Sequence, residues 1–410
     1  MPPLVPKPPH PQPRPRTRTR TLLITLDAFQ TLYRPRRAIA TQYLSVAASH
    51  HGLHIADPSS ATTIDAFTAS FRKAFQANYA RAPNYGYGSG SGSGGGRVAP
   101  PRSSPSPSGR RLPLTPALTP ERWWRCVVHD TFAPLLEGSG ERVPEGLADS
   151  LFRWFGGREA YEPVFGCGAV FEAGGAVEGR GRGRGRGVGE RVPVRARAPK
   201  VVVGVLTNSD PRVSSVLGSL GVAVGVPAQR RDEVAPGGEG VGHVDFVLTS
   251  YEIGVEKPHP RAFLAAERMA RWVSRRSATR PTLSGLSSSS VAPPHPEDVL
   301  VPPEEETKEE EEDDMLKVHI GDDLHKDYLG AIGAGRGWHA ILLDRTTRHS
   351  NSTENRHAET TGQQPGRKVE GADNASVVDD GARRISSLTD AMEVILQLSR
   401  QQSRRGGCIT

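Results

Sequence analysis

The sequence predicts an α/β protein whose core has three layers around a parallel sheet, with an inserted helical cap and long disordered inserts. Two observations predict this fold class. Short apolar runs, each typical of a buried parallel strand, end repeatedly in small clusters of polar residues. A long stretch with only helical periodicity separates the first run from the second, as expected of a helical unit inserted into a sheet protein.

Composition limits how much of the chain is folded. The chain has 410 residues, of which 45 are Gly and 35 are Pro, and only 36% are hydrophobic, so a large part never enters a core. The three cysteines are widely spaced and odd in number, which argues against a disulfide framework and for a reducing compartment. No apolar run approaches the roughly 20 residues of a membrane span. We therefore expect an intracellular protein, in the cytoplasm or the nucleus, that does not enter membranes.

Shifts in composition predict the domain boundaries. The Pro-rich and basic segment 1–20 is expected to be a disordered arm. The core is expected to be formed by 21–36 together with 159–400. The purely helical stretch between them, 37–158, is the predicted cap.

Low-complexity segments predict four disordered inserts, at 86–111 in the cap and at 173–198, 274–314 and 346–383 in the core. The second of them contains an Arg-Gly run, which is a composition able to lie along single-stranded nucleic acid. No aromatic residue interleaves these arginines to stack on a base. We therefore expect no nucleic-acid partner, and the sequence does not identify a partner protein.

The first predicted strand, Leu22 to Leu26, is followed directly by Asp27. The carboxyl end of such a strand is where parallel sheets place their ligands. An ionised Asp there can act as a nucleophile that forms a covalent intermediate, and Thr31 can offer a hydroxyl to the same small space. This stretch alone fits equally well an Asp that caps a loop after an ordinary strand.

Helical periodicity fills the next part of the chain. Gly52 is expected to end a first helix, a second follows through Phe67 and Tyr79, and Thr119 with Pro120 is expected to open a third. A fourth carries aromatic and leucine side chains between 147 and 155. Aromatic stripes at helical spacing are far more often core than ligand contacts, so we interpret them as core.

The second predicted strand, Lys200 to Leu206, ends in Thr207 and Asn208, and a helix opens shortly afterwards at Asp210. The hydroxyl of Thr207 and the neighbouring backbone amides could bind an anionic oxygen at that helix start. The commoner role of an isolated Thr at such a position is to cap a turn.

A third strand is predicted at Phe246 to Thr249, and the segment after it holds Lys257 between prolines at a helix start. A lysine fixed in this way can neutralise a carboxylate or a phosphate, although most lysines face solvent.

The fourth predicted strand, Lys317 to Ile320, leads into an acidic segment that contains Asp322, Asp323 and Asp327. Carboxylates gathered at a strand end repel one another unless a cation or a lysine compensates them. The segment therefore predicts either a divalent metal site or a carboxylate–lysine network. A fifth strand is expected at Trp338 to Leu343, and a last amphipathic helix at Ile385 to Leu398.

The four polar clusters, taken in order, resemble the motifs of the haloacid dehalogenase-like hydrolase superfamily. The matching segments are 21–32, 201–210, 252–260 and 318–327. The residues around Asp27 and those from Gly321 onwards are most similar to the subgroup called haloacid dehalogenase-like hydrolase domain-containing protein three. The resemblance implies a Rossmann-like core, and in this superfamily a helical cap is inserted after the first motif, as predicted here.

The resemblance also implies roles for the motif residues. Asp27 would be the nucleophile, Lys257 would stabilise the charge around it, and Mg²⁺ would be the cofactor. The implied catalytic set is Asp27, Thr31, Thr207, Asn208 and Lys257, the metal set is Asp27, Asp322 and Asp327, and the substrate contacts are Phe29, Thr207 and Asn208.

Phe29 departs from the pattern of the phosphatases in this superfamily, which carry a second Asp two residues after the nucleophile to protonate the leaving group. The dehalogenases carry an aromatic residue there and need no metal, but they lack the acid pair of Asp322 and Asp323. We therefore expect a hydrolase with an aspartate nucleophile that acts on a small phosphorylated or halogenated substrate. The alternative is a catalytically weak member that serves as a regulatory or binding protein.

Overall fold

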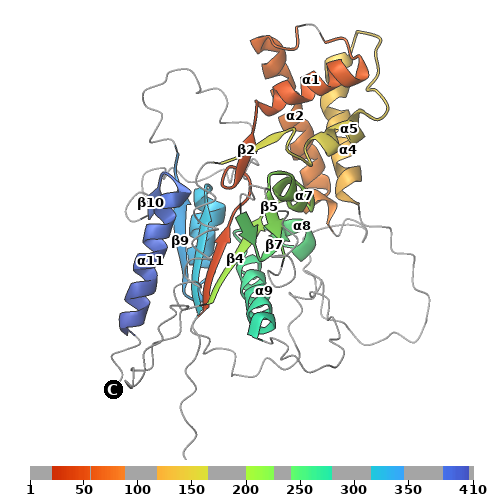
Figure 1. Ribbon diagram of the computed structural model, residues 1–410. Helices are drawn as coiled ribbons and strands as arrows, with labels where there is room; N and C mark the ends of the chain where they lie inside the picture. Colours follow the sequence, from red (N-terminus) through yellow and green to blue (C-terminus); the bar gives the residue numbers. More distant parts are fainter. Residues whose placement is uncertain are drawn as a thin grey trace, which may run out of the picture.

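The computed structural model describes residues 21–55, 57–87, 118–164, 200–225, 242–278, 315–345 and 382–405 (Figure 1). The predicted basic arm and most of each predicted insert lie outside these described residues. Within the described part, no helix is both long and apolar enough to cross a lipid bilayer.

The core contains a six-stranded sheet with the strand order β10-β9-β8-β1-β4-β7, and each pair of neighbours is parallel. This confirms the predicted parallel sheet. Its strands are β1 (Thr21–Leu26), β4 (Lys200–Thr207), β7 (Phe246–Thr249), β8 (Met315–Gly321), β9 (Trp338–Leu343) and β10 (Arg384–Ile385).

The chain reverses its direction of growth between β1 and β8. From β1 it builds outward through β4 to β7, and it then returns to the other side of β1 to add β8, β9 and β10. Ligands of open α/β sheets bind at such a switch point, outside the carboxyl ends of the strands. The topology therefore marks the end of β1 and the end of β8 as the place for a site.

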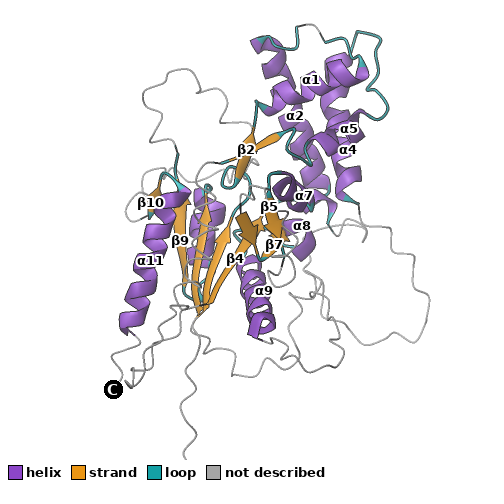
Figure 2. Cartoon of the chain, viewed as in Figure 1, coloured by secondary structure: helices purple, strands orange, loops and turns teal. Residues whose placement is uncertain are grey.

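Helices cover both faces of the sheet, which gives the predicted three layers (Figure 2). On one face, alternate β1 residues such as Ile24 and Leu26 pack with α7 (Arg212–Ser219) and α11 (Leu388–Arg405). On the other face, Leu23 packs with α9 (Pro260–Ala278). A buried central strand must be apolar on both sides, which is why β1 reads as a continuous apolar run.

Four helices form a second packed unit beyond the carboxyl end of β1: α1 (Ile39–His51), α2 (Ala61–Arg81), α4 (Pro120–Phe132) and α5 (Leu147–Trp154) (Figure 1). A two-stranded antiparallel ribbon of β2 (Tyr33–Pro35) and β3 (Tyr161–Pro163) joins this unit to the sheet. Two predicted helix ends are confirmed. Gly52 has the left-handed conformation after α1, and the side chain of Thr119 accepts a hydrogen bond from the backbone of Arg122 at the start of α4.

Two predicted boundaries are wrong. The last helix begins at Leu388 rather than at Ile385, because Ile385 pairs with Leu343 and adds a short edge strand to the sheet. The segment from Ser274 to Ala278, assigned to a disordered insert, continues α9. The remaining short elements are α3 (Pro83–Gly86), η1 (Ala133–Leu136), β5 (Val222–Val224), β6 (Gly242–Val244), α8 (Ser250–Ile253), η4 (Leu324–Leu329) and α10 (Gly330–Gly333).

Candidate active site

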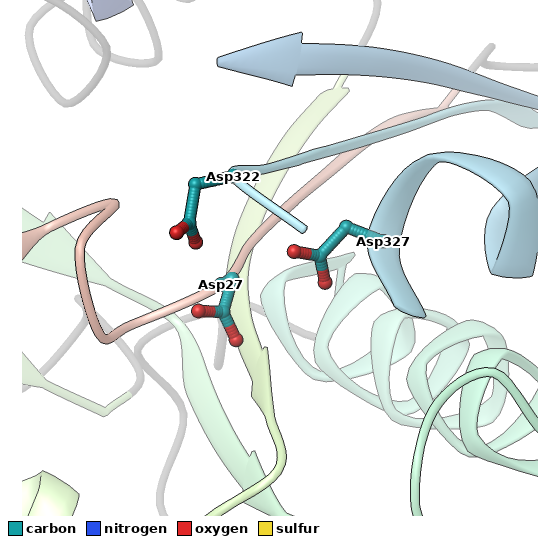
Figure 3. Close-up of side chains that lie close together, drawn as sticks. All are labelled: Asp27, Asp322 and Asp327. Atoms are coloured by element: carbon teal, nitrogen blue, oxygen red, sulfur yellow. The ribbon is translucent and has the colours of Figure 1, made fainter. Parts of the chain in front are cut away.

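Asp27 lies where the first strand ends, at the switch point of the sheet. Its backbone N–H donates to the carbonyl of Ile320 over 2.8 Å, so the pairing of β1 with β8 continues up to the site. Asp322 directly follows the end of β8. Asp327 lies in the short helix η4, which comes next in the chain. Figure 3 shows the three carboxylates gathered together, and each offers an oxygen atom within 4.8 Å of the others.

Lys257 binds two of these carboxylates. Its ammonium donates to Oδ1 of Asp27 over 2.8 Å, to Oδ1 of Asp327 over 2.6 Å and to the carbonyl of Leu206 over 2.7 Å. These three acceptors use all three of its protons. Only 3% of Lys257 is exposed, so it is not the solvent-facing lysine that its type would suggest. The carboxylate–lysine network that the sequence allowed is present.

Asn208 fixes the backbone at Lys257. Its side-chain Nδ2 donates to the Lys257 carbonyl over 2.8 Å, and its Oδ1 accepts from the Lys257 amide over 2.8 Å. Both ends of the amide are therefore used within the protein. Asn208 reaches the predicted site, but through Lys257 and not as an open side chain.

Thr207 and Thr31 flank the carboxylates from two other segments. Thr207 ends β4, is 3% exposed and contributes a side-chain hydrogen bond to Asp27. Thr31 is fully buried, and its hydroxyl makes a long contact of 3.4 Å with Oδ1 of Asp322. Both predicted hydroxyls thus lie beside the carboxylates.

Phe29 lies at the border between the sheet and the helical unit. Its ring makes edge contacts with Tyr33 and Tyr161, with ring centroids 6.2 and 6.4 Å apart. The neighbouring Gln30 has a φ of 60°, which turns the chain sharply after Asp27. The position that follows the candidate nucleophile by two residues is therefore part of an aromatic cluster.

Burial and neighbouring charges shift the pKa values of this group in opposite directions. Burial raises the pKa of Asp27, although Lys257 opposes this, and burial together with the charges of Asp27 and Asp327 raises the pKa of Asp322 to about 7. Burial would also raise the pKa of Asp327, but Lys257 and His319 together hold it below its ordinary value. The charges of both acids raise the pKa of Lys257 despite its burial.

These shifts test whether a cation suits the site. Lys257 is one positive charge beside three carboxylates, and Asp322 has no cationic partner among the described residues. A raised pKa means that Asp322 lacks a charge that would stabilise its ionised form. Hard oxygen ligands gathered in this way suit Mg²⁺. The donor set therefore fits a divalent cation between Asp27 and Asp322.

A buried polar pair that was not predicted from the sequence lies below the carboxylates. His319, in the middle of β8, is fully buried and contacts Oδ1 of Asp327 through Nε2 at 3.1 Å. Its Nδ1 lies 2.8 Å from the hydroxyl of Thr25 on β1. A signal was available, because Thr25 and His319 are polar residues that lie between apolar neighbours in their strands.

A second missed feature connects the helical unit to the sheet. Asn84 and Tyr85 both have left-handed backbones, with φ values of 48° and 58°. The side chain of Asn84 exchanges two hydrogen bonds with Ser250, over 2.7 and 2.8 Å, and the hydroxyl of Tyr85 donates to the Asn208 carbonyl over 3.1 Å. The turn therefore holds the helical unit against the segment that fixes Lys257.

Comparison with known proteins agrees with the motifs. The chain is 25% identical over 248 residues to haloacid dehalogenase-like hydrolase domain-containing protein 3 of Mus musculus and 26% identical over 248 residues to that of Homo sapiens, in both cases over 60% of this chain and 68% of the relative. No family model matches the chain.

A solved structure of 2-haloacid dehalogenase from Pseudomonas syringae aligns with 92% of this chain and 99% of its own, at 14% identity and a TM-score of 0.39. The order of the four motifs, the parallel sheet and the named relatives agree with one another. The chain is similar to members of the haloacid dehalogenase-like hydrolase superfamily.

Proposed function

We propose that the protein is a hydrolase that uses Asp27 as its nucleophile on a small phosphorylated or halogenated substrate. One observation carries the proposal: Asp27 lies at the switch point of the sheet, with the Lys257 ammonium 2.8 Å from its Oδ1. A lysine at that distance favours the ionised form of the carboxylate and offsets negative charge brought by a substrate.

In the proposed reaction, an Asp27 oxygen attacks phosphorus, or the carbon that carries a halogen, and the bond to the leaving group breaks. Water then hydrolyses the aspartyl intermediate and restores the carboxylate. Thr207 is placed to donate a hydrogen bond to the transferred group, because its hydroxyl already contacts Asp27. Lys257, held by Asn208, stays beside the reacting atoms throughout.

Asp27 and Asp322 would hold Mg²⁺, which would offset charge on the substrate and on the carboxylates. For a halogenated substrate this contribution is not needed, since halide departs without a metal. Metal dependence of turnover therefore separates the two substrate classes.

Phe29 favours a second candidate, a binding or regulatory protein with little catalytic power. A positioned acid typically contributes about 10²- to 10⁴-fold to a proton transfer, and the side chain at position 29 has no proton to give. Its ring packs edge-on against Tyr33 and Tyr161, which is a structural role.

The test is a panel of alkyl phosphates, nitrophenyl phosphate, acyl phosphates and 2-haloacids, each assayed with and without Mg²⁺. The hydrolase proposal expects turnover of at least one class by the wild type and none by Asp27→Asn. Absence of turnover across the whole panel, from a folded wild-type protein, would leave the binding protein as the better account.

A further inference from the structure

His319 occupies a position where a central strand normally carries an apolar side chain. Its strand neighbours Val318 and Ile320 are fully buried, and so is His319. The ring lies under α9, edge-on to Phe263 with centroids 5.4 Å apart. A buried polar group costs stability unless both of its polar atoms are paired, and here both are. The two hydrogen-bond partners therefore hold the imidazole in one specific orientation.

The arrangement begins at Thr25, which pairs with His319 across the strand register. The Thr25 hydroxyl is 2.8 Å from Nδ1 of His319, and its other acceptor, the Val318 carbonyl, is further away at 3.4 Å. Asp327 is ionised beside Lys257 and needs a donor, so the ring proton of the neutral imidazole belongs on Nε2. Thr25 then donates to Nδ1 and fixes this tautomer.

Asp327 is held from three directions. Its Oδ1 accepts from Lys257 over 2.6 Å and from His319 over 3.1 Å, and its Oδ2 accepts from the backbone amide of Asp323 over 3.0 Å. The space beside it is closed, because a Cβ atom on Gly321 would lie 2.2 Å from the Asp327 carboxyl carbon. The carboxylate therefore cannot turn toward Asp322 without losing these contacts.

We propose that Thr25 and His319 are positioning residues that commit Asp327 to Lys257, so that Asp327 acts in the reaction through the lysine while Asp27 and Asp322 hold the cation. The inference rests on the proposed function and deepens it. It divides the acidic triad into two cation-binding carboxylates and one lysine-binding carboxylate. The Thr25–His319 pair holds Asp327 in the orientation that binds Lys257, and not in one that binds the cation.

The deciding variants are His319→Phe, which keeps a ring against Phe263 but has no donor for Asp327, and His319→Gln, which restores an N–H donor. A displacement of about 1 Å in a group beside a reacting centre can lower the rate about 100-fold. We expect His319→Phe to lower kcat by that factor with little change in the KM for substrate. His319→Gln should recover most of the loss.

Calorimetry with Mg²⁺ alone provides the readout that does not depend on activity. If Asp327 serves Lys257, His319→Phe should bind Mg²⁺ with an affinity within about threefold of wild type, whereas Asp322→Asn should lose 10- to 100-fold or more. A comparable loss of affinity in His319→Phe, with kcat restored at saturating Mg²⁺, would show that Asp327 is a metal ligand and overturn the inference. An unchanged kcat in His319→Phe would overturn it as well.

Thr25→Val and Thr25→Ser make the same comparison at the other end of the pair, should His319→Phe fail to fold. Thr25→Val keeps the shape of the side chain but removes the hydroxyl, and Thr25→Ser keeps the hydroxyl. We expect a lower kcat in the first and not in the second; equal values in both variants would contradict the role of Thr25. Turnover by the wild type tests the proposed function, while the ratios among these variants test the positioning pair, so the two can fail separately.

Discussion

The ammonium of Lys257 lies 2.6 Å from Oδ1 of Asp327, even though Lys257 follows β7 and Asp327 follows β8, two strands on opposite sides of β1 in the sheet. Both groups are almost fully buried, with side-chain exposures of 2% each. A buried pair of this kind is maintained only while both partners remain, because the charge left by removing one partner is costly.

Replacing the lysine should therefore destabilise the fold. Lys257→Met leaves Asp27 and Asp327 buried without their cation, and we expect the free energy of unfolding to fall by about 3–5 kcal/mol at pH 7. Lys326→Met is the matched control, since Lys326 pairs with Asp323 at 3.4 Å on a partly exposed surface. Urea denaturation should show a loss below about 1 kcal/mol for the control. Equal losses would contradict the buried pair.

The same pair predicts how this difference depends on pH. Lys257 holds the folded-state pKa of Asp327 below its ordinary value, so the stability that Asp327 contributes is present above pH 4 or so. It is lost as the pH falls through the folded-state pKa. Below about pH 4 the gap between the wild type and Lys257→Met should narrow. Denaturation curves at pH 3 and pH 7 measure it, and a gap that widens in acid would be inconsistent with this pairing.

Asp322 predicts a different pH dependence for metal binding. Burial and its acidic neighbours raise the pKa of Asp322 to about 7, and a protonated carboxyl does not bind a cation. Mg²⁺ affinity should therefore rise as the pH increases through 7 and then level off, with protons released on binding. Without metal, the folded state holds this proton more tightly than the unfolded state, so this group destabilises the fold as the pH rises from 4 to 7. Calorimetry in two buffers of different ionisation enthalpy should detect the proton in the wild type and not in Asp322→Asn.

The left-handed turn at Asn84 predicts a difference between two substitutions. Asn84→Ala and Asn84→Gly both lose the hydrogen bonds to Ser250, but only alanine also pays for a left-handed backbone, at about 1–2 kcal/mol. We expect Asn84→Gly to be the more stable variant by about 1 kcal/mol. Thermal unfolding of the two variants gives the comparison, and a more stable Asn84→Ala would argue against strain at this turn.

Phe29 predicts which leaving groups the protein can expel. Phe29→Asp supplies a carboxylic acid and should raise turnover of alkyl phosphates, by up to about 10²- to 10⁴-fold, because an alkoxide needs a proton to leave. Nitrophenyl phosphate and 2-haloacids should gain little, since their leaving groups depart unprotonated. Phe29→Asn is the control, because its side chain has nearly the same shape as that of Phe29→Asp but carries no acid. Ordinary enzymatic rates on alkyl phosphates in the wild type would mean that another residue is the acid.

Much of the site could be predicted because parallel strands bring their carboxyl ends to one edge. An apolar run followed by Asp27, Thr207 or Asp322 predicts that these side chains meet, whatever the order of the strands. The contacts within the site depend on register, which local pattern does not contain. Thr25 faces His319 only because β1 and β8 are neighbours in this sheet.

Two features of the fold, the edge strand at Ile385 and the turn at Tyr85, were not predicted, for similar reasons. Ile385 continues the apolar spacing of the last helix, but an edge strand of two residues is too short to have a period of its own. The left-handed backbone of Tyr85 has no local signal, because tyrosine rarely adopts it. Tertiary contacts of the neighbouring Asn84 with Ser250 determine that turn.

The most direct test of the account is the covalent intermediate on Asp27. The wild-type protein would be mixed with acetyl phosphate or a 2-haloacid, quenched in acid within a single turnover, digested and examined by mass spectrometry. The account predicts a phosphoryl adduct or a carboxyalkyl ester on the peptide that contains Asp27, and no adduct in Asp27→Asn. Substrate turnover that persists in Asp27→Asn, or an adduct on another residue, would contradict it.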